Sequence, residues 1–405
     1  MAIAKGITSG GLPYRDFFDH KTPGIYFALF GIVKLFGNSV LVPKTFLVFV
    51  NLATVVFTFL IAKKIKVNGN IAAVFTLFRM IFFEGNSIIA EPFVILFLTI
   101  SLYLLLQPRF AIQYFLAGLC LGISILFKQT AVVNLMVILL LCLITSKWSK
   151  LLMILLGAGT IFASVFLYIY LNGLVIPAYE QIILYNITSY PREHLVLLLS
   201  NLWPAFVLIL PLWALFIIGL NKRFISNHLL VIAFAILPIP LFFIRHYPHY
   251  WLQIIPFVAI VAAYAYNKIH LRYQYLILAF IILVMIFPVT QIRRNIILLD
   301  EQFRITKYLN SLQEDRILTE NQFSSYYFLS DKKPLNKYLY ITEIDDWSEG
   351  AQNKTISDLQ IHLNTVIIWP KDSNFAYAKN LQSYILDNYS IKKSYDQSGV
   401  LILSK

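Results

Sequence analysis

Long apolar runs, separated by short polar connectors, make up the greater part of this 405-residue chain. A helix needs about 20 apolar residues to cross the hydrocarbon of a bilayer, and somewhat fewer when the flanking side chains snorkel. By this measure the pattern predicts ten membrane spans. They are expected at residues 40–62, 71–83, 88–106, 110–127, 130–145, 151–171, 195–220, 228–244, 250–266 and 274–290.

A further apolar run precedes these spans. Residues 24–36 are interrupted by Lys34, which predicts an interfacial or re-entrant helix rather than a crossing. Residues 1–11 are short and Gly-rich and lack the apolar core of a cleavable signal peptide. We therefore expect the first segment to insert by its own hydrophobicity.

The composition supports an integral membrane protein. Hydrophobic residues make up 59% of the chain and charged residues only 13%, whereas ordinary chains are about a quarter charged. The formal net charge of +13 then reflects loop topology, and no nucleic-acid partner is expected. Cys120 and Cys142 both lie inside apolar runs and are interpreted as small core residues.

Basic residues are unevenly distributed among the connectors. Ten fall in one alternate set of connectors and three in the other, and cytoplasmic loops are the ones that collect Lys and Arg. The first set is therefore predicted to be cytoplasmic and the second extracytoplasmic. The ten are Lys63, Lys64, Lys66, Arg109, Lys147, Lys150, Lys222, Arg223, Lys268 and Arg272, and the three are Lys128, Arg192 and Arg245.

This topology places the rare polar side chains on one face of the membrane. Charged groups near hydrocarbon are costly and usually have a partner or a function, so their gathering favours a site on the extracytoplasmic face. The polar residues on this face are those of the Asp16/Asp19 loop with Lys21, and Glu84, Glu91, Lys128, Gln129, Tyr190, Arg192, Glu193, His194, Arg245, His246, Tyr247, His249 and Tyr250.

The composition changes after Arg293 and Arg294. Residues 1–297 are predicted to form the membrane domain, and residues 298–405 a small α/β domain that ten crossings place outside the cytoplasm. Strands are expected from β-branched and aromatic content, and one amphipathic helix from its periodicity. The strands are at 316–319, 326–329, 338–341, 365–369 and 400–403, and the helix is at 375–389.

The densest charges lie in the segment 14–24, which we call the charged loop. Pro23 biases Thr22 toward extended geometry, so a sharp turn into the next helix is expected. A transferase that acts on a hydroxyl needs a carboxylate to take the proton and a cation to hold a departing phosphate. Asp16 or Asp19 with Lys21 could supply both; the alternative is a solvated turn with an internal Asp/Lys pair.

Two further motifs each have a structural and a functional interpretation. Glu91 precedes Pro92, and the pair either starts a helix or places an acid with a function. Lys128 stands between two spans, where it either snorkels or holds a phosphate.

Residues 245–251 contain one arginine followed by several aromatic and imidazole side chains. This is either an aromatic belt or a phosphate site made of Arg245, His246, His249 and Tyr250. The two histidines are three residues apart, but Pro248 breaks helical spacing, so no metal site is predicted. There is also no Gly-rich phosphate loop and no zinc-protease or nucleophile-elbow motif in the sequence, which disfavours ATP hydrolysis and protease chemistry.

Taken in order, these motifs resemble those of the multi-spanning GT-C glycosyltransferases. The resemblance is strongest to the PMT-type group, which is related to protein mannosyltransferases and to the aminoarabinose transferase that modifies lipid A. The tail around residues 326–340 is similar too. The motifs are Gly11-x-Pro13-Tyr14-Arg15-Asp16-x-x-Asp19-His20-Lys21-x-Pro23-Gly24, Leu35-Phe36-Gly37, Ala90-Glu91-Pro92-Phe93, Lys128-Gln129 and His249-Tyr250-x-x-Gln253-x-x-Pro256.

The resemblance implies an inverting transfer of a hexose or pentose from a polyprenyl-phosphate carrier to a glycan, lipid or protein acceptor outside the cytoplasm. It implies acid chemistry for Asp16 or Asp19, a loop-fixing role for Lys21, and contact of Arg245, His249 and Tyr250 with the carrier phosphate. No cofactor is implied with certainty, and participation of a divalent cation stays open.

One departure affects this interpretation. The family pattern begins with an additional helix whose outer end bears an acid, commonly taken as catalytic, whereas residues 1–5 resemble the interior of the segment that follows it. Either the start lies upstream, or Asp16 or Asp19 substitutes for that acid. The alternatives to an enzyme are an inactive accessory subunit whose outer domain binds glycan or a partner, and a flippase or transporter of lipid-linked glycans. No inverted repeat or midplane polar path, expected of a transporter, is found in the sequence.

Overall fold

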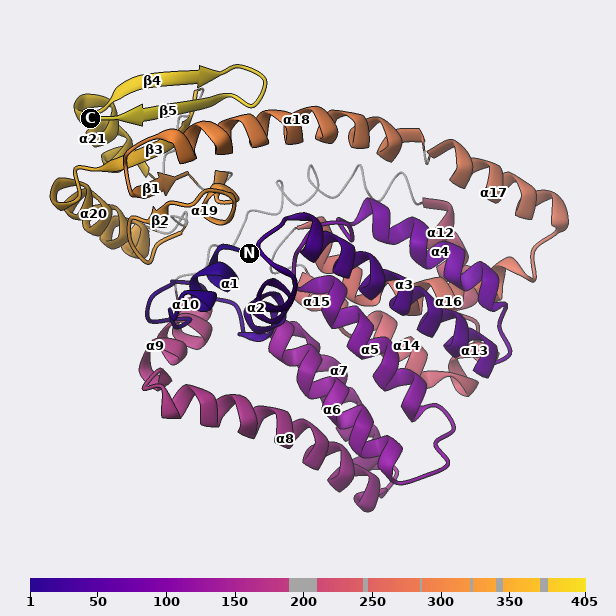
Figure 1. Ribbon diagram of the computed structural model, residues 1–405. Helices are drawn as coiled ribbons and strands as arrows, with labels where there is room; N and C mark the ends of the chain where they lie inside the picture. The colour runs from indigo at the N-terminus through magenta and orange to yellow at the C-terminus, as the bar shows by residue number, and fades with distance from the viewer. Residues whose placement is uncertain (189–209, 243–246, 285, 321–322, 340–344, 372–377) are drawn as a thin grey trace.

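The computed structural model describes residues 1–188, 210–242, 247–284, 286–320, 323–339, 345–371 and 378–405. Figure 1 shows a bundle of helices, a sheet with its own helices at one edge of that bundle, and the long helix α18 (Ile286–Ser311) running between them. This helix passes without a break through the predicted boundary between residues 297 and 298.

Helices form at the predicted apolar runs within the described residues. Three have the length and apolar composition to cross a membrane: α3, α8, and the continuous helical stretch His249–Tyr266. Shorter apolar helices accompany them. The bounds are α3 Leu41–Lys64, α4 Gly69–Phe82, α5 Glu91–Leu105, α6 Ile112–Phe127, η1 Gln129–Ala131, α7 Val132–Ile144, α8 Trp148–Leu171, α12 Leu210–Gly219, α14 Leu229–Ile236, α15 Ile239–Phe242, η3 Pro248–Ile254, α16 Ile255–Tyr266 and α17 Leu271–Val284.

Two of the predicted spans are each divided between two helices in the structure. The run 228–244 is not one helix, because α14 ends before Pro238 and α15 restarts at Ile239; proline cannot donate the helical hydrogen bond. The run 274–290 likewise falls on two helices, α17 and the start of α18. Residues 195–209 of another predicted span lie outside the described residues.

The predicted interfacial segment is helix α2 (Gly24–Phe36). Its buried residues form one stripe, Ile25, Tyr26, Leu29, Ile32 and Val33, which is the spacing of one helix face. A side chain at Gly24 would lie 2.5 Å from the Leu126 carbonyl oxygen, so glycine lets the start of α2 approach the end of α6.

Close contact also joins α6 to α8. A Cβ atom at Gly118 would meet the Ile154 carbonyl at 2.2 Å, and Gly122 faces Ala158 in the same groove. Small residues at these positions let the two backbones pack directly against each other.

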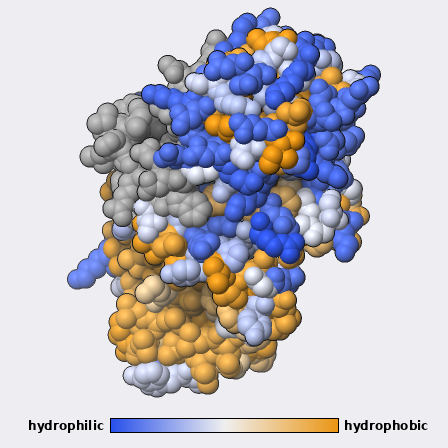
Figure 2. Space-filling view, turned by 90° about the vertical axis from the view of Figure 1, so that its left-hand side faces the viewer, coloured by the Kyte–Doolittle hydropathy of each residue, from blue (hydrophilic) through white to orange (hydrophobic). Residues whose placement is uncertain are grey.

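The surface of the bundle is apolar in a way that fits a multi-pass membrane protein. Large apolar side chains stay exposed along its outer helices, including Phe49 on α3, Met136 on α7 and Phe166 on α8. Figure 2 shows this apolar surface gathered at one end of the molecule and hydrophilic surface at the other. Such extensive apolar exposure is typical of contact with lipid.

Residues 316–404 contain a five-stranded sheet with strand order β2-β1-β3-β5-β4. The β1 strand is parallel to β2 and β3, whereas β5 is antiparallel to β3 and β4. The bounds are β1 Arg316–Thr319, β2 Lys333–Pro334, β3 Thr365–Pro370, β4 Ser390–Tyr395 and β5 Val400–Ser404, with helices α19 Tyr326–Leu329, α20 Asp345–Ile361 and α21 Lys379–Asn388.

Both faces of the central strand β3 are buried. Val366 and Ile368 belong to the main hydrophobic core together with Ile305 of α18, whereas Ile367 and Trp369 pack in a second core with Leu381 of α21. Successive side chains of a strand point to opposite faces of the sheet. A strand that is buried on both faces therefore needs apolar residues at every position.

The sequence predictions for this region are partly wrong. Residues 326–329 form a helical turn, α19, not a strand; a four-residue aromatic run carries no periodicity that separates the two. Tyr338 and Leu339 lie outside the strands, and residues 340–341 are not among those described. The strands at 316–319, 365–369 and 400–403 are confirmed, as is a helix, α21, within 375–389, whereas β2, β4 and α20 were not predicted.

Short helices complete the described part of the chain. They are α1 Ala2–Thr8, α9 Val175–Tyr179, the π-helix η2 Glu180–Leu184, α10 Tyr185–Thr188 and α13 Lys222–Asn227.

Candidate functional site

The charged loop is held in shape by a buried glutamine from another part of the chain. Gln181 of η2 donates to the Tyr14 carbonyl at 2.6 Å and accepts from the Asp19 backbone N–H at 3.0 Å. The Tyr14 hydroxyl donates to the Lys21 carbonyl at 2.9 Å, and burial raises the pKa of this phenol well above its usual value, so it stays protonated. The hydrogen bond from Tyr14 to Lys21 thus ties the start of the charged loop to its end.

Asp19 lies on the buried side of this loop. Its carboxylate side chain is 8% exposed and has two basic neighbours, since Oδ1 is 3.7 Å from both His20 Nδ1 and Lys21 Nζ. The same oxygen accepts from the Lys21 backbone N–H at 3.2 Å. Lys21 therefore contacts the acid through its backbone and its side chain.

Asp16 lies on the outer side of the same loop. Its side chain is 35% exposed and accepts two hydrogen bonds from Arg15, at 3.0 and 2.8 Å, and one from the Leu12 N–H at 2.8 Å. The hydrogen bonds from Arg15 lower the pKa of this carboxyl. The two predicted acids thus point into different surroundings.

A second group of charges lies at the ends of the bundle helices; we call Glu84, Glu91, Lys128, His249 and Tyr250 the Lys128 cluster. Lys128 Nζ pairs with Glu91, and it lies 3.1 Å from the centroid of the Tyr250 ring. His249 joins the two acids, with Nε2 3.8 Å from Glu91 and Nδ1 3.0 Å from Glu84. Five candidate residues from three segments that are far apart in sequence are therefore brought together here.

The loop and the Lys128 cluster adjoin each other at the end of α6. Gln129, next to Lys128, donates to the His20 carbonyl at 3.3 Å, and Asn186 donates to the same oxygen at 2.8 Å. Thr22 donates to the Ile125 carbonyl at 3.3 Å. The backbone carrying Asp19 is thus fixed directly against the backbone carrying Lys128.

A buried polar network lies beneath the Lys128 cluster. Gln253 accepts from the Thr130 hydroxyl at 2.8 Å and donates to Asn134 Oδ1 at 2.8 Å. Gln253 and Asn134 are both buried, and the hydrogen bond between them satisfies the Asn134 oxygen. The network ties α7 to η3, the helix that carries His249 and Tyr250.

Some residues of the site carry little or no signal in the sequence. Glu84 has the sequence context of a plausible loop acid, yet it pairs with His249 from a left-handed backbone with φ of 61°. Gln181 and Asn186 were not predicted; a π-helix such as η2 is often found at functional sites, but no sequence pattern indicates it. Arg245 and His246 lie outside the described residues, as do Tyr190, Arg192, Glu193 and His194.

Within the described ranges, no three His, Cys, Asp or Glu side chains are grouped so as to hold a metal ion. The site as described is therefore a set of carboxylates, ammonium groups and imidazoles. Such a set can move a proton and bind an anion.

Comparison with known proteins gives a match in structure alone. No family model and no curated protein matches the chain. The structure is similar to two crystal structures of ArnT from Cupriavidus metallidurans. For the one bound to undecaprenyl phosphate the TM-score is 0.63 at 13% identity, covering 99% of this chain and 92% of that one. For the apo state the TM-score is 0.64 at 12% identity, covering 99% and 91%.

This similarity extends over nearly the whole chain and assigns the fold. The chain has a GT-C fold of the PMT type, as the resemblance of the sequence motifs implied. At so low an identity the likeness concerns the fold, and the chemistry has to be argued from the residues of the site.

Proposed function

We propose that this protein is a membrane glycosyltransferase that transfers a sugar from a polyprenyl-phosphate donor to an acceptor outside the cytoplasm, with inversion at the sugar carbon. The observation that carries the proposal is that the charged loop, which contains Asp19, adjoins the Lys128 cluster in an ArnT-like fold. An acid that can take a proton thereby lies beside cations that can receive a phosphate.

The Lys128 cluster is the proposed phosphate site. Lys128 and His249 supply positive charge or hydrogen-bond donors, and Glu91 with the Tyr250 ring holds the ammonium group in place. Arg245 and His246, a few residues before His249 in the sequence, would add donors to this phosphate. A polyprenyl tail could then stay in the lipid while its phosphate meets the cluster at the helix ends.

Asp19 is the proposed base. The acceptor hydroxyl oxygen attacks the anomeric carbon on the face opposite the phosphate, and its proton passes to the carboxylate. The bond from the anomeric carbon to the phosphate oxygen breaks, and the electron pair leaves with the polyprenyl phosphate. Lys21 and His20, whose nitrogens lie 3.7 Å from Oδ1, hold the carboxylate in a fixed orientation.

The extracytoplasmic location follows from charge. The connectors with Lys63, Lys147 and Lys222 belong to the basic set, whereas the charged loop and the Lys128 cluster belong to the other. The region 298–405 would lie on the same side as the site. Undecaprenyl phosphate, which is bound in one of the two ArnT structures, supports a donor of this class.

The proposal is tested by donor turnover in liposomes. The purified full chain is supplied with undecaprenyl-phosphate-linked sugars one at a time, together with a membrane extract as the source of acceptor, and released undecaprenyl phosphate is measured. We expect release with the native chain, loss of release in Lys128→Gln, and normal release in Lys44→Gln, which changes an exposed lysine of α3. Binding of undecaprenyl phosphate without release from any donor would favour the inactive accessory subunit and overturn the enzyme assignment.

A further inference from the structure

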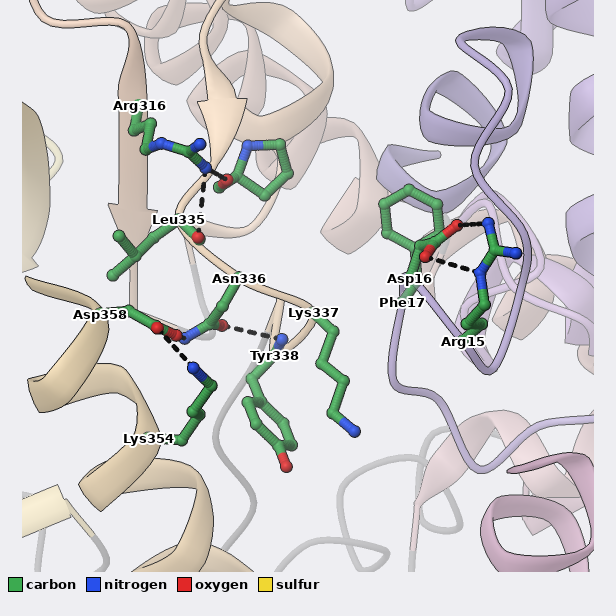
Figure 3. Close-up of a pocket in the computed structure, with 11 residues that line it drawn as sticks. Arg15, Asp16, Phe17, Arg316, Leu335, Asn336, Lys337, Tyr338, Lys354 and Asp358 are labelled. Carbon is green, nitrogen blue, oxygen red and sulfur yellow. Dashed lines mark hydrogen bonds and ion pairs between the residues drawn. The ribbon is translucent and has the colours of Figure 1, made fainter. Parts of the chain in front are cut away.

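A pocket of about 470 Å³ opens between the charged loop and the sheet region. Figure 3 shows Arg15 and Asp16 on one side and Arg316, Lys337 and Tyr338 on the other. Every residue that lines it comes from the loop or from residues 316–358, and none from the apolar helices. The pocket is therefore open to a water-borne ligand rather than to lipid.

The lining of the pocket is positive. Of its charged side chains, Arg15 is paired with Asp16, and Lys354 with Asp358 at 2.6 Å. Among the described residues no ion pair joins Arg316 or Lys337 to a carboxylate. Two positive charges are thus left over, and an anionic group in the pocket would balance them.

Arg316 and Lys337 differ in what they already contact. Arg316 Nη1 donates to the Pro334 and Leu335 carbonyls, both at 3.4 Å, so it also shapes the pocket wall. The Lys337 side chain is exposed, and its ammonium lies 5.3 Å from the Tyr338 ring centroid. Lys337 is therefore the cation that can turn toward a ligand at the smallest structural cost.

The remaining lining suits a sugar ring. Asn336 accepts from the Tyr338 backbone N–H at 2.9 Å and donates to Asp358 at 3.1 Å, which fixes the segment that carries the Tyr338 ring. A sugar has apolar C–H groups on its faces and hydroxyls at its edge. An aromatic ring beside amide and charged groups complements both.

The pocket is also coupled to the proposed base. The Phe18 N–H donates to the Lys337 carbonyl at 2.9 Å, and the Phe18 ring lies 5.7 Å from Tyr338 and 5.3 Å from Tyr185, centroid to centroid. Phe18 is buried and immediately precedes Asp19. A ligand against Tyr338 therefore touches the structure that positions the Asp19 segment.

We propose that this pocket binds the acceptor through a saccharide that carries a negative charge, a phosphate or a carboxylate, with Lys337 selecting the charge and Tyr338 contacting the ring. Its role as an acceptor site rests on the proposed function, whereas the binding itself does not. The inference thus names the chemical class of the acceptor.

The test measures sugar binding without any donor. Glucuronate and glucose, which differ in one carboxylate, are titrated separately into the purified full chain in detergent, and saturation-transfer NMR reports contact and affinity. We expect glucuronate to bind about threefold to tenfold more tightly than glucose, as for one partly exposed ion pair. Lys337→Gln should abolish this preference, and Lys333→Gln should retain it, because Lys333 is an exposed lysine of the same region that does not line the pocket.

Several results would overturn the inference. Equal affinity for glucose and glucuronate would show that the pocket does not select a negative charge. Equal effects of Lys337→Gln and Lys333→Gln on the glucuronate preference would show that Lys337 is not the selecting residue. Displacement of glucuronate by an equal concentration of acetate would reduce the pocket to a simple anion site. Displacement by phosphatidylglycerol vesicles, but not by phosphatidylcholine vesicles, would make it a lipid-headgroup site.

These outcomes are separable from failure of the proposed function. If undecaprenyl phosphate is never released but glucuronate selection holds, the transferase assignment falls and the saccharide site remains. If release is normal and glucuronate selection is absent, only the pocket assignment falls.

Discussion

The charged loop separates two groups of charges that differ in burial. On the bundle side, Glu91 and Lys128 have side chains only 7% and 15% exposed, and each has further partners. On the pocket side, Arg15 and Asp16 form a pair with both members open to water. Both places hold a pair of opposite charges. If one partner is removed, water can solvate the remaining charge at the exposed pair but not at the buried pair.

Burial therefore separates contacts that hold a charge in place for chemistry from contacts that can adjust to a ligand. A site that must hold a charge in one position gains from burial and from several partners at once. A site that selects an incoming group gains from a cation that can still move. The following predictions test this contrast, beginning with the largest expected effect.

Replacing Asp19 should have the largest effect on turnover. Asp19→Asn keeps the shape of the side chain but removes the proton acceptor, and loss of a general base costs about 10²-fold to 10⁴-fold in rate. Asp16→Asn, three residues away, should cost much less because Asp16 lies on the pocket side. Single-turnover rates of the two variants decide between them; a larger loss in Asp16→Asn would transfer the base role to Asp16.

Breaking the Glu91–Lys128 pair should strongly reduce stability. Lys128→Met leaves Glu91 buried with His249 as its remaining basic neighbour, and removing one partner of a buried pair costs about 3–5 kcal/mol. The double variant Lys128→Met/Glu91→Gln should recover part of this loss, because no buried acid is left without its ammonium. Thermal unfolding in detergent measures both, with Lys44→Met as the exposed control.

Recovery in the double variant is the informative outcome. If the double variant were as unstable as the sum of the two single variants, the pair would contribute no coupling. The burial argument for the bundle side would then be wrong.

Removing the Tyr250 ring should have a moderate effect on donor use. Tyr250→Leu removes the ring face under the Lys128 ammonium, and a cation–π contact contributes about 0.5–2 kcal/mol, so the donor KM should rise about twofold to thirtyfold. Tyr250→Phe keeps the ring face and should stay near the native KM. A similar KM increase in both variants would assign the effect to the hydroxyl instead.

The smallest effect is expected from titration of Asp16. Its pKa is lowered in the folded chain by Arg15, so the pair stabilises the fold above the usual Asp pKa of about 3.9. This stabilisation is lost as the pH falls through the lowered folded value. Solvent screening makes it small, so the thermal midpoints of the native chain and Asp16→Asn should differ slightly near neutral pH and converge in acid. A constant difference at all pH values would show that ionisation of Asp16 is not its source.

The helices of the bundle could be predicted from the sequence because their cause is local. A run of apolar residues dictates a helix in lipid, and the predicted runs 110–127 and 151–171, at α6 and α8, contain no charged residue. The prediction of a strand at 326–329 is wrong because the run Tyr-Tyr-Phe-Leu contains too little periodicity to separate a strand from a helix, and in the fold α19 packs against α1 and β1.

The candidate site shows the opposite case. The sequence alone shows that acids, bases and imidazoles are rare and gathered in a few segments, and it predicts a turn at Pro23 where the charged loop ends. Only the tertiary structure decided the partners. Glu91 meets Lys128 across 37 positions, and Glu84 meets His249 across 165.

The same holds for the difference between Asp16 and Asp19. Both acids stand in one short motif, each beside a basic neighbour, so the sequence does not show which of them is buried. Gln181, 162 positions beyond Asp19, holds that segment inward, and Lys337 accepts the hydrogen bond of Phe18 from the sheet region. Hydrophobic periodicity acts over one or two helical turns, whereas burial and ion pairing depend on which distant segments pack together. The local sequence pattern therefore determined the helices of the bundle. The fold determined that Asp19 is buried and Asp16 partly exposed.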